Sequence, residues 1–131
     1  MGATARKDGY IEGGGYAVTW AFGHLVGPAM PEAYGIEGFK RENLPILPET
    51  FVLEPRRVKS GKEYKPDPGA VKQLAVLKEL FSRAERIVVA TDAGREGELI
   101  FRFVYHYLDC KTPFDRLWIS SLTERAIREG L

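Results

Sequence analysis

A short apolar run that ends in an acidic, glycine-containing turn constrains this chain more than any other feature. Residues 87–91 read Ile-Val-Val-Ala-Thr, residues 92–98 carry three carboxylates, and a long apolar segment follows over 99–108. This order is typical of a buried parallel strand that leads directly into a helix. Because ligands of open α/β sheets bind at the carboxyl ends of strands, the carboxylates lie where such a fold places its chemistry.

The three carboxylates, Asp92, Glu96 and Glu98, have both a structural and a functional interpretation. Acidic residues in a first helical turn stabilise the helix by about 0.3–1 kcal/mol each, and Asp92 can act as the cap. The reciprocal capping-box spacing is absent, since Arg95 lies three residues after Asp92, where glutamate or glutamine is needed. Carboxylates this close also repel one another unless a cation neutralises them. Mg²⁺ suits such an oxygen-rich site, so the pattern predicts Mg²⁺ with these three residues as candidate ligands.

Composition narrows the class of protein. The 131 residues fit one domain with a real core, and the formal net charge is only +1, so any nucleic-acid contact must come from local patches. The single cysteine, Cys110, excludes an internal disulfide and fits a reducing compartment. No apolar run reaches the roughly 20 residues of a membrane helix, and no signal-peptide pattern opens the chain. We therefore expect no membrane partner.

The first half of the chain predicts a hairpin and then a long irregular region. Residues 9–12 and 16–20 flank three glycines at 13–15, as in a β-hairpin whose turn needs positive φ. Prolines and glycines recur over 26–68, which predicts extended loop with short strands, the clearest at 50–54. This region is apolar and aromatic, so we expect it to pack on the sheet.

The second half alternates helices and strands. The expected order is a helix over 68–83, a strand over 87–91, a helix over 95–108, a strand over 116–119 and a helix over 122–129. Asp67 can cap the first helix ahead of Pro68, and Ser121 fits a capping box before the last. The helix over 95–108 is apolar almost all round, which predicts burial on all sides. The alternation implies an α/β fold with a parallel sheet and right-handed crossovers.

The residues Thr-Asp-Ala-Gly-Arg-Glu-Gly-Glu over 91–98 resemble the acidic motif of toprim domains, most closely that of type IA DNA topoisomerases, D-x-D-x-E-G-E. The chain departs from this motif at Gly94, where the family usually has its second aspartate. The resemblance to topoisomerase III continues elsewhere in the family's order. It covers W-x-x-G-H-L at 20–25, P-x-x-Y at 31–34, the Leu-Pro-Glu at 47–49 and the strand-to-helix junction at 116–123.

This resemblance implies a Rossmann-like toprim domain, with a mainly parallel sheet flanked by helices and an added β-hairpin. It implies an ATP-independent isomerase that cuts, passes and religates single DNA strands through a 5′-phosphotyrosine. Asp92, Glu96 and Arg95 would be catalytic, and Mg²⁺ would be the cofactor. The partners would be DNA, especially single-stranded DNA, and further topoisomerase domains, in the bacterial cytoplasm or nucleoid.

Two features of the family are not found in residues 1–131. The family's first strand, which ends in a glutamate in an E-K-P-S context, has only a superficial echo at 63–66, and nothing resembles the surroundings of the nucleophilic tyrosine. We therefore expect a partial toprim domain that lacks its first β-α unit and the tyrosine domain. By itself it should not cleave or relax DNA.

Several other polar residues are candidates for DNA contact, each with a plainer alternative. Arg95 either holds the carboxylates by salt bridges or grips a phosphate, and His24 is either a structural histidine or a phosphate contact. Ser120 is free to face the metal site. The basic stretch over 56–65, which includes Tyr64, is either a solvated loop or a site that binds the DNA backbone. Its candidates for DNA contact are Arg56, Arg57 and Lys59.

Two other functions remain open. Another toprim enzyme, such as a primase or nuclease, would need the same acidic site, although the patterns at 20–25 and 31–34 argue against it. A non-catalytic nucleic-acid-binding or interaction module is favoured slightly by the loss of the second aspartate at Gly94.

Overall fold

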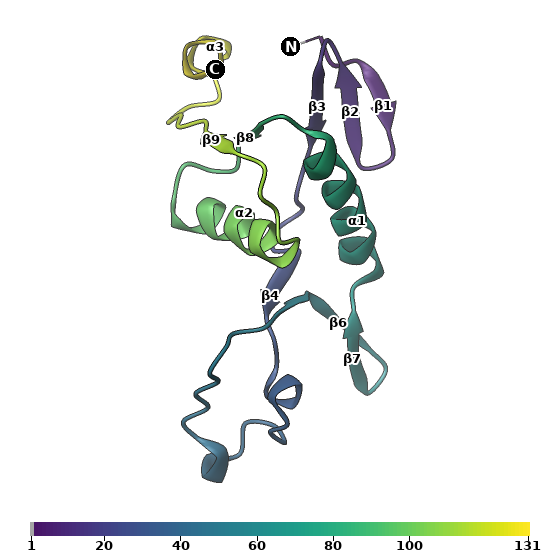
Figure 1. Cartoon of the computed structure of the whole chain (residues 1–131), viewed down its shortest axis with the longest axis vertical. Helices are drawn as coiled ribbons and strands as arrows, with labels where there is room; N and C mark the ends of the chain where they lie inside the picture. The colour runs from purple at the N-terminus through teal and green to yellow at the C-terminus, as the bar shows by residue number, and fades with distance from the viewer. Residues whose placement is uncertain (1) are drawn as a thin grey trace.

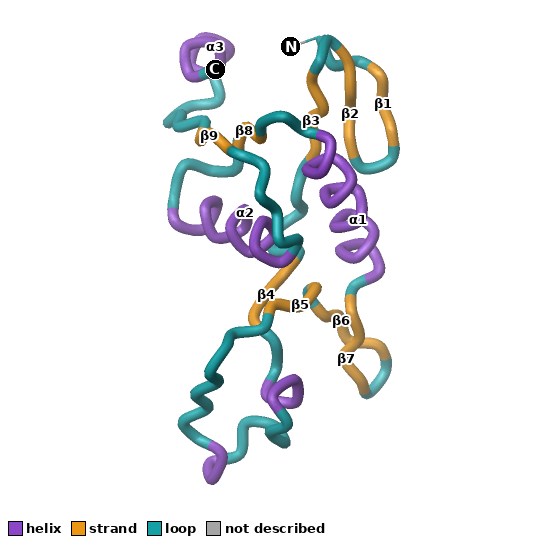
Figure 2. The backbone as a smooth tube through the Cα atoms, in the orientation of Figure 1, coloured by secondary structure: helices purple, strands orange, loops and turns teal. Residues whose placement is uncertain are grey.

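The computed structural model describes residues 2–131, and Figures 1 and 2 show its elements in order along the chain. The strands are β1 Ala5–Lys7, β2 Tyr10–Gly13, β3 Tyr16–Thr19, β4 Val26–Pro28, β5 Leu53–Pro55, β6 Arg57–Ser60, β7 Glu63–Pro66, β8 Ile87–Val89 and β9 Phe114–Arg116. The helices are α1 Pro68–Arg83, α2 Arg95–Tyr107 and α3 Glu124–Gly130, with 3-10 turns at η1 Pro31–Tyr34 and η2 Arg41–Asn43. Within residues 2–131, none of the helices has the length and apolar character needed to cross a membrane.

The predicted β-hairpin forms the centre of the N-terminal sheet. Strands β2 and β3 pair antiparallel, with Gly13 opposite Tyr16, and β1 adds a third antiparallel strand that the sequence pattern did not indicate. The turn glycines all have positive φ, which is the conformation that the hairpin needs.

Gln73 fastens this sheet to α1. It is a buried polar residue, 5% exposed, and its Nε2 donates to the carbonyls of Gly9 and Trp20 at 3.1 and 2.8 Å and to Thr19 Oγ1 at 3.0 Å. Buried polar groups are retained when they are hydrogen-bonded, and here one amide donates to acceptors from both chain segments at the open end of the β2–β3 hairpin. The contact fixes the sheet against the middle of the helix.

The expectation of a mainly parallel sheet is wrong. Among the described residues only β8 and β9 pair parallel, with Val88 opposite Asp115, and the other three small sheets are antiparallel. The reason is connectivity. A parallel pair needs a long crossover connection, and α2 supplies one between β8 and β9. Tight turns, which allow only antiparallel pairing, join β1 to β2, β2 to β3 and β6 to β7. The α/β class is confirmed, but with one parallel pair at its centre.

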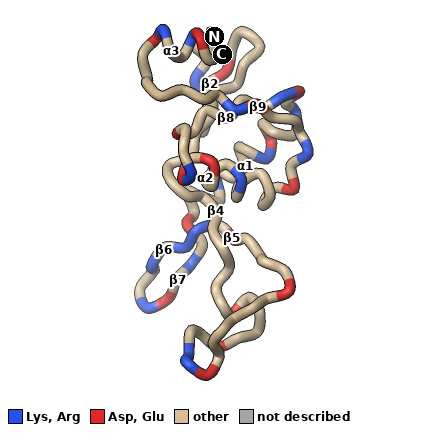
Figure 3. The backbone as a smooth tube through the Cα atoms, turned by 90° about the vertical axis from the view of Figure 1, so that its left-hand side faces the viewer, with Lys and Arg blue, Asp and Glu red and all other residues tan. Residues whose placement is uncertain are grey.

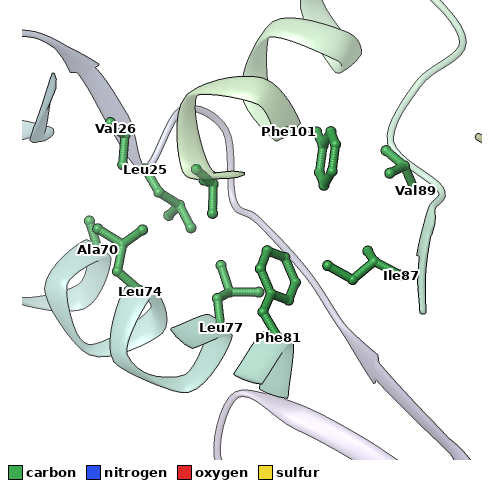
Figure 4. Close-up of a cluster of buried hydrophobic side chains, with 10 residues drawn as sticks. Leu25, Val26, Ala70, Leu74, Leu77, Phe81, Ile87, Val89 and Phe101 are labelled. Carbon is green, nitrogen blue, oxygen red and sulfur yellow. The ribbon is translucent and has the colours of Figure 1, made fainter. Parts of the chain in front are cut away.

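The core lies between α1, α2, β4 and β8, as Figure 4 shows. Side chains from all four elements meet there, and its members are Leu25, Val26, Ala70, Leu74, Leu77, Phe81, Ile87, Val89, Phe101 and Val104. Helix α2 contributes only one face, because Gly97, Phe101 and Val104 are buried while Arg102 and His106 are exposed. The expectation that this helix is buried on all sides is therefore wrong, since no described element covers its outer face.

The capping residues predicted from the sequence are correct for α1 but not for α3. Helix α1 has the predicted bounds, and Asp67 caps it by accepting from the backbone N of Gly69 at 2.9 Å. Helix α3 begins later than predicted, because Thr123 rather than Ser121 caps it, accepting from Ala126 N at 3.3 Å. Strand β9 is shifted relative to the predicted strand at 116–119: it begins two residues earlier, at Phe114, and ends three residues earlier, at Arg116.

Residues 29–52, here called the arm, extend away from the helices below β4 in Figure 1. Pairing of β4 with β5 closes the base of the arm, and Tyr34 Oη accepts from Val52 N at 2.9 Å. Phe39, Leu47 and Phe51 are 67%, 81% and 75% exposed, so the expectation that this region packs on the sheet is wrong for them. The antiparallel base directs the connecting chain outwards, beyond the reach of the core.

Candidate functional site

The acidic turn, residues 92–98, links the carboxyl end of β8 to α2. The N-cap position of α2 is Gly94, which offers no side-chain cap, and its backbone N donates to Asp92 O at 2.8 Å. Asp92 is therefore not the helix cap, and its exposed side chain is free for another role. The structural interpretation of Asp92 as an N-cap is excluded.

Glu96 is held from one side by His24. The imidazole Nε2 of His24 lies 3.1 Å from Glu96 Oε2, where it can donate a hydrogen bond, and the His24 ring lies 6.2 Å from the Phe103 ring on α2. The Glu96 side chain remains 74% exposed. The structure thus brings His24, which is 72 residues away in sequence, into the acidic turn.

Glu98 faces two arginines. Its Oε1 accepts from Arg102 Nε at 2.7 Å, and its Oε2 lies 3.3 Å from Arg116 Nη2. Both oxygens are therefore engaged by cations. Within residues 2–131 no three histidine, cysteine, aspartate or glutamate side chains form a group that could hold a metal ion.

Arg116 organises the turn, and its role escaped the sequence analysis. Its Nη1 donates to Thr91 Oγ1 at 2.7 Å, and its Nη2 donates to the Asp92 carbonyl at 2.9 Å. The side chain is only 16% exposed, and its Nε is buried without a partner among the described residues. Because β9 lies parallel to β8, Arg116 sits opposite Val89 and reaches the turn that follows that strand. The available sequence signal was only a basic residue at the start of the strand predicted over 116–119.

Gly97 allows the turn to close on itself. A Cβ at this position would lie 2.1 Å from Asp92 O, and Thr91 Oγ1 donates to the Gly97 carbonyl at 2.7 Å. The first turn of α2 therefore packs directly on the backbone at Asp92, and no side chain fits between them. A glycine inside a helical pattern often marks such a close approach of backbone segments.

Gly94, unlike Gly97, has room for a side chain. Its φ of −175° is extended backbone that any residue adopts, and a Cβ there would have no atom within 4 Å. The position where the resembled family usually has aspartate is therefore open, and glycine is not required there.

The remaining predicted site residues lie in different places. Arg95 is exposed at the start of α2 and makes no ion pair within the described part of the chain, so the proposed salt bridges to the carboxylates are not seen. Ser120 is exposed in the segment between β9 and α3, and no hydrogen bond joins it to the acidic turn within residues 2–131.

The three basic candidates belong to β6 or lie just before it, on the other side of the molecule from the acidic turn in Figure 1. Arg56 donates from Nε to Asp67 Oδ2 at 2.7 Å and stacks over the Phe22 ring at 5.0 Å, so it has a structural role. Arg57 lies 3.5 Å from Glu54, and Lys59 is exposed.

The donor chemistry of the acidic turn fits Mg²⁺ through two residues. Asp92 and Glu96 present exposed carboxylate oxygens, and Mg²⁺ is commonly bound by one or two carboxylates together with water and phosphate oxygens. Glu98 does not fit as a third ligand in this arrangement, because arginines occupy both of its oxygens.

Known proteins match this chain over nearly its whole length. It is 46% identical to DNA topoisomerase 3 of Bacillus subtilis (strain 168) over 127 residues, which are 95% of this chain and 16% of that protein. It is 42% identical to DNA topoisomerase 3 of Shouchella clausii over 134 residues, and 42% identical to that of Staphylococcus haemolyticus over 135 residues. In both cases the match covers 99% of this chain and 17% of the relative, so the chain spans about a sixth of their length.

These identities confirm the resemblance to topoisomerase III that the motifs indicated. The Toprim domain profile matches residues 3–122, which include both strands of the parallel pair and the whole acidic turn. The chain therefore belongs to the Toprim domain family.

Proposed function

We propose that this chain is the part of a type IA DNA topoisomerase, similar to topoisomerase 3, that presents a Mg²⁺-binding acidic turn to DNA. The 46% identity to DNA topoisomerase 3 of Bacillus subtilis carries the proposal. The exposed carboxylates of Asp92 and Glu96 beyond β8 support it. The longer enzyme would act without ATP, in the bacterial cytoplasm or nucleoid, on DNA with single-stranded regions.

In the proposed reaction, a tyrosine from another domain attacks a phosphodiester of one DNA strand. Its oxygen bonds to phosphorus while the bond to the 3′ oxygen breaks, which leaves a 5′-phosphotyrosyl link and a 3′ hydroxyl. Another strand passes through the gap, and the 3′ hydroxyl then attacks the link, reseals the strand and releases the tyrosine.

The residues of this chain would bind and orient the phosphate. Asp92 and Glu96 would hold Mg²⁺, which when bound neutralises and positions the scissile phosphate. Arg95 is exposed and without an ion pair among the described residues, so its guanidinium is available to bind a phosphate oxygen pair. His24 would keep the Glu96 carboxylate in place, and Arg116 would keep the backbone at Asp92 in place.

A chimera tests the proposed activity. This chain would replace the matching segment of DNA topoisomerase 3 of Bacillus subtilis, and relaxation of supercoiled plasmid with Mg²⁺ would be measured. We expect activity in the chimera and its loss with Asp92→Asn. The matched control is Asp115→Asn, an exposed carboxylate on β9 paired with Arg86 at 2.7 Å, which should leave activity unchanged. A folded but inactive chimera would support a non-catalytic module instead.

Calorimetric titration of Mg²⁺ into this chain tests the site itself. Two carboxylates without DNA should bind Mg²⁺ weakly, and either Asp92→Asn or Glu96→Gln should abolish the binding heat. Asp115→Asn should not change it. Binding that persists in both site variants would show that the cation is held elsewhere.

The chain by itself should not relax DNA, because the attacking tyrosine is proposed to come from another domain. Supercoiled plasmid incubated with the purified chain and Mg²⁺ should remain supercoiled. Relaxation that co-purifies with the chain, and is lost in Asp92→Asn, would contradict this division of labour between domains.

A further inference from the structure

The β6–β7 hairpin is the most basic exposed element of the molecule. Residues 57–66 hold four lysines and arginines against one glutamate, a charge of +3 in a chain whose net charge is +1. The rest of the chain therefore carries −2. Figure 3 shows the basic positions along both strands of the hairpin. Every residue of both strands is exposed, so no described element covers either face.

The register of the hairpin sorts its side chains onto two different faces. Arg57 lies opposite Pro66 and Lys59 lies opposite Tyr64, and opposite residues share a face. One face therefore carries Arg57, Lys59 and Tyr64. The other face carries two further cross-strand pairs, Val58 with Lys65 and Ser60 with Glu63. The only acidic side chain of the hairpin thus lies on the face away from Tyr64.

The side chains of the Tyr64 face are largely unused inside the molecule. The Tyr64 ring is 64% exposed, and its hydroxyl makes no hydrogen bond to another residue in 2–131. Lys59 makes no ion pair within the same residues, and Arg57 has only a contact with Glu54 at 3.5 Å. On the opposite face, Lys65 lies 3.7 Å from Glu63.

The position of the hairpin is fixed at its base. Asp67 N donates to the carbonyl of Arg56 at 2.8 Å, and Arg56 Nε donates to Asp67 Oδ2 at 2.7 Å. Asp67 also caps α1, so the hairpin is attached directly to the first turn of that helix. The Tyr64 face therefore has a fixed position relative to α1.

We propose that the face formed by Arg57, Lys59 and Tyr64 binds single-stranded DNA at a site separate from the acidic turn. Tyr64 stacks on one unpaired base, while Lys59 and Arg57 contact flanking phosphates. The two cations are two residues apart on one strand, about 7 Å, which matches the reach between successive phosphates of an extended single strand. This inference depends on the proposed function only in taking DNA as the ligand.

Single-stranded rather than duplex DNA fits the chemistry of this face. A base offers its ring surface to an aromatic side chain only when it is unstacked and unpaired, and such stacking tolerates any sequence. Cations beside an aromatic ring then track the backbone without reading bases. Duplex DNA would contact only the side chains of Lys59 and Arg57. A substitution at Tyr64 should therefore weaken the binding of single-stranded DNA and leave the binding of duplex DNA unchanged.

Fluorescence anisotropy with a labelled oligodeoxythymidylate of about 12 nucleotides tests the proposal. The measurement uses this chain in EDTA at about 50 mM salt and again at about 200 mM. Tyr64→Ala should weaken binding roughly tenfold, whereas Tyr64→Phe should bind like the wild type because the ring remains. Far-UV circular dichroism and a urea midpoint verify that each variant is folded.

Two lysines on opposite faces provide the matched control. Lys59→Ala should weaken binding and reduce the slope of log affinity against log salt by about 0.7, the value for one phosphate contact on a single strand. Lys65→Ala removes the same charge from the other face and should change affinity less than about twofold.

Three results would overturn the proposal. They are unchanged binding by Tyr64→Ala, equal losses from Lys59→Ala and Lys65→Ala, or equal competition by duplex and single-stranded DNA. Asp115→Asn, which removes an exposed carboxylate from outside both sites, should bind the oligonucleotide like the wild type in EDTA. Because this assay needs neither Mg²⁺ nor strand cleavage, an inactive chimera would leave the hairpin result intact, and the reverse also holds.

Discussion

The acidic turn and the β6–β7 hairpin are both charged and accessible, but they are held by different kinds of contact. The turn depends on tertiary packing, because Gly97 lies against the backbone of Asp92 and Arg116 from a neighbouring strand bonds to that backbone. The hairpin depends on its own cross-strand pairing and on one attachment at Arg56 and Asp67. Substitutions at the packed residues of the turn, Gly97 and its partner Arg116, should therefore disturb both stability and binding, whereas substitutions on the hairpin faces should change binding alone.

The difference also concerns the charges themselves. In the turn, Glu96 and Glu98 are oriented by His24, Arg102 and Arg116, so two of its three carboxylates have defined partners. In the hairpin, Lys59 and Lys62 make no ion pair with another described residue. A ligand carboxylate oriented by His24, on a turn whose backbone is held by Arg116, suits a site that must position a small ion, while free charges on a fixed base suit a flexible polyanion.

The largest expected effect comes from Gly97→Ala. The new Cβ would lie 2.1 Å from the carbonyl oxygen of Asp92, and neither backbone segment can move without breaking the start of α2. We expect a loss of about 3 kcal/mol in the free energy of unfolding, at the upper end for overpacking, together with loss of Mg²⁺ binding. Urea unfolding and calorimetry measure the two effects. A variant as stable as the wild type would show that the turn is far more adaptable than its contacts indicate.

Arg116→Met should have the next largest effect. It removes the hydrogen bonds to Thr91 and to the Asp92 carbonyl from a side chain that is only 16% exposed, at an expected cost of about 2 kcal/mol. The matched control is Arg86→Met. Arg86 is 58% exposed and pairs with Asp115, so its loss should cost less than about 1 kcal/mol. Equal losses in the two variants would contradict the special role of Arg116.

Asp67→Asn tests the attachment of the hairpin, with a smaller effect that depends on pH. The hydrogen bond from Arg56 lowers the pKa of Asp67, so the ionised form is favoured in the folded state. This stabilisation is complete above the ordinary aspartate pKa of about 3.9 and is lost as the pH falls through the lower folded pKa. Asparagine keeps the helix cap but not the charge.

The difference in urea midpoint between wild type and Asp67→Asn should therefore be present at neutral pH and should shrink in acid. Comparing the two proteins at each pH cancels the titration of the other carboxylates. A midpoint difference that stays constant down to the lowest pH at which both proteins fold would contradict the ion pair.

Gly94→Ala should have the smallest effect. The position has extended φ and open space around a Cβ, so the only cost is that alanine is a poorer N-cap than glycine, and the free energy of unfolding should change by less than about 1 kcal/mol. Gly94→Asp fits the same space and adds a carboxylate to the turn, which should strengthen Mg²⁺ binding severalfold. A severe loss of stability in Gly94→Ala would remove the contrast with Gly97.

Local signals predicted the elements whose causes are local. Helix α1 has the predicted bounds because an aspartate cap, a proline at the first position and a spaced apolar face all lie within its own residues. The β2–β3 hairpin formed where three glycines supply positive φ. The parallel pairing of β8 and β9 followed from the helix between them.

The errors arose where burial by distant elements decides the outcome. The apolar pattern of α2 predicted burial all round, but no described element covers its outer face. The aromatic residues of the arm suggested packing on the sheet, but pairing of β4 with β5 directs the arm away from the core. Neither result is encoded within the segment concerned.

The sequence by itself determined the family, the position of the acidic turn after a buried strand, and the basic character of residues 56–65. These depend on residue types and on spacings along a single segment. Only the tertiary structure decided which charges are free and which are used. Arg116 meets Asp92, His24 meets Glu96, and Arg56 is taken by Asp67, while the pairing register places Lys59 beside Tyr64. Such contacts join residues far apart in the chain or depend on strand register, so they appear only when the elements have packed.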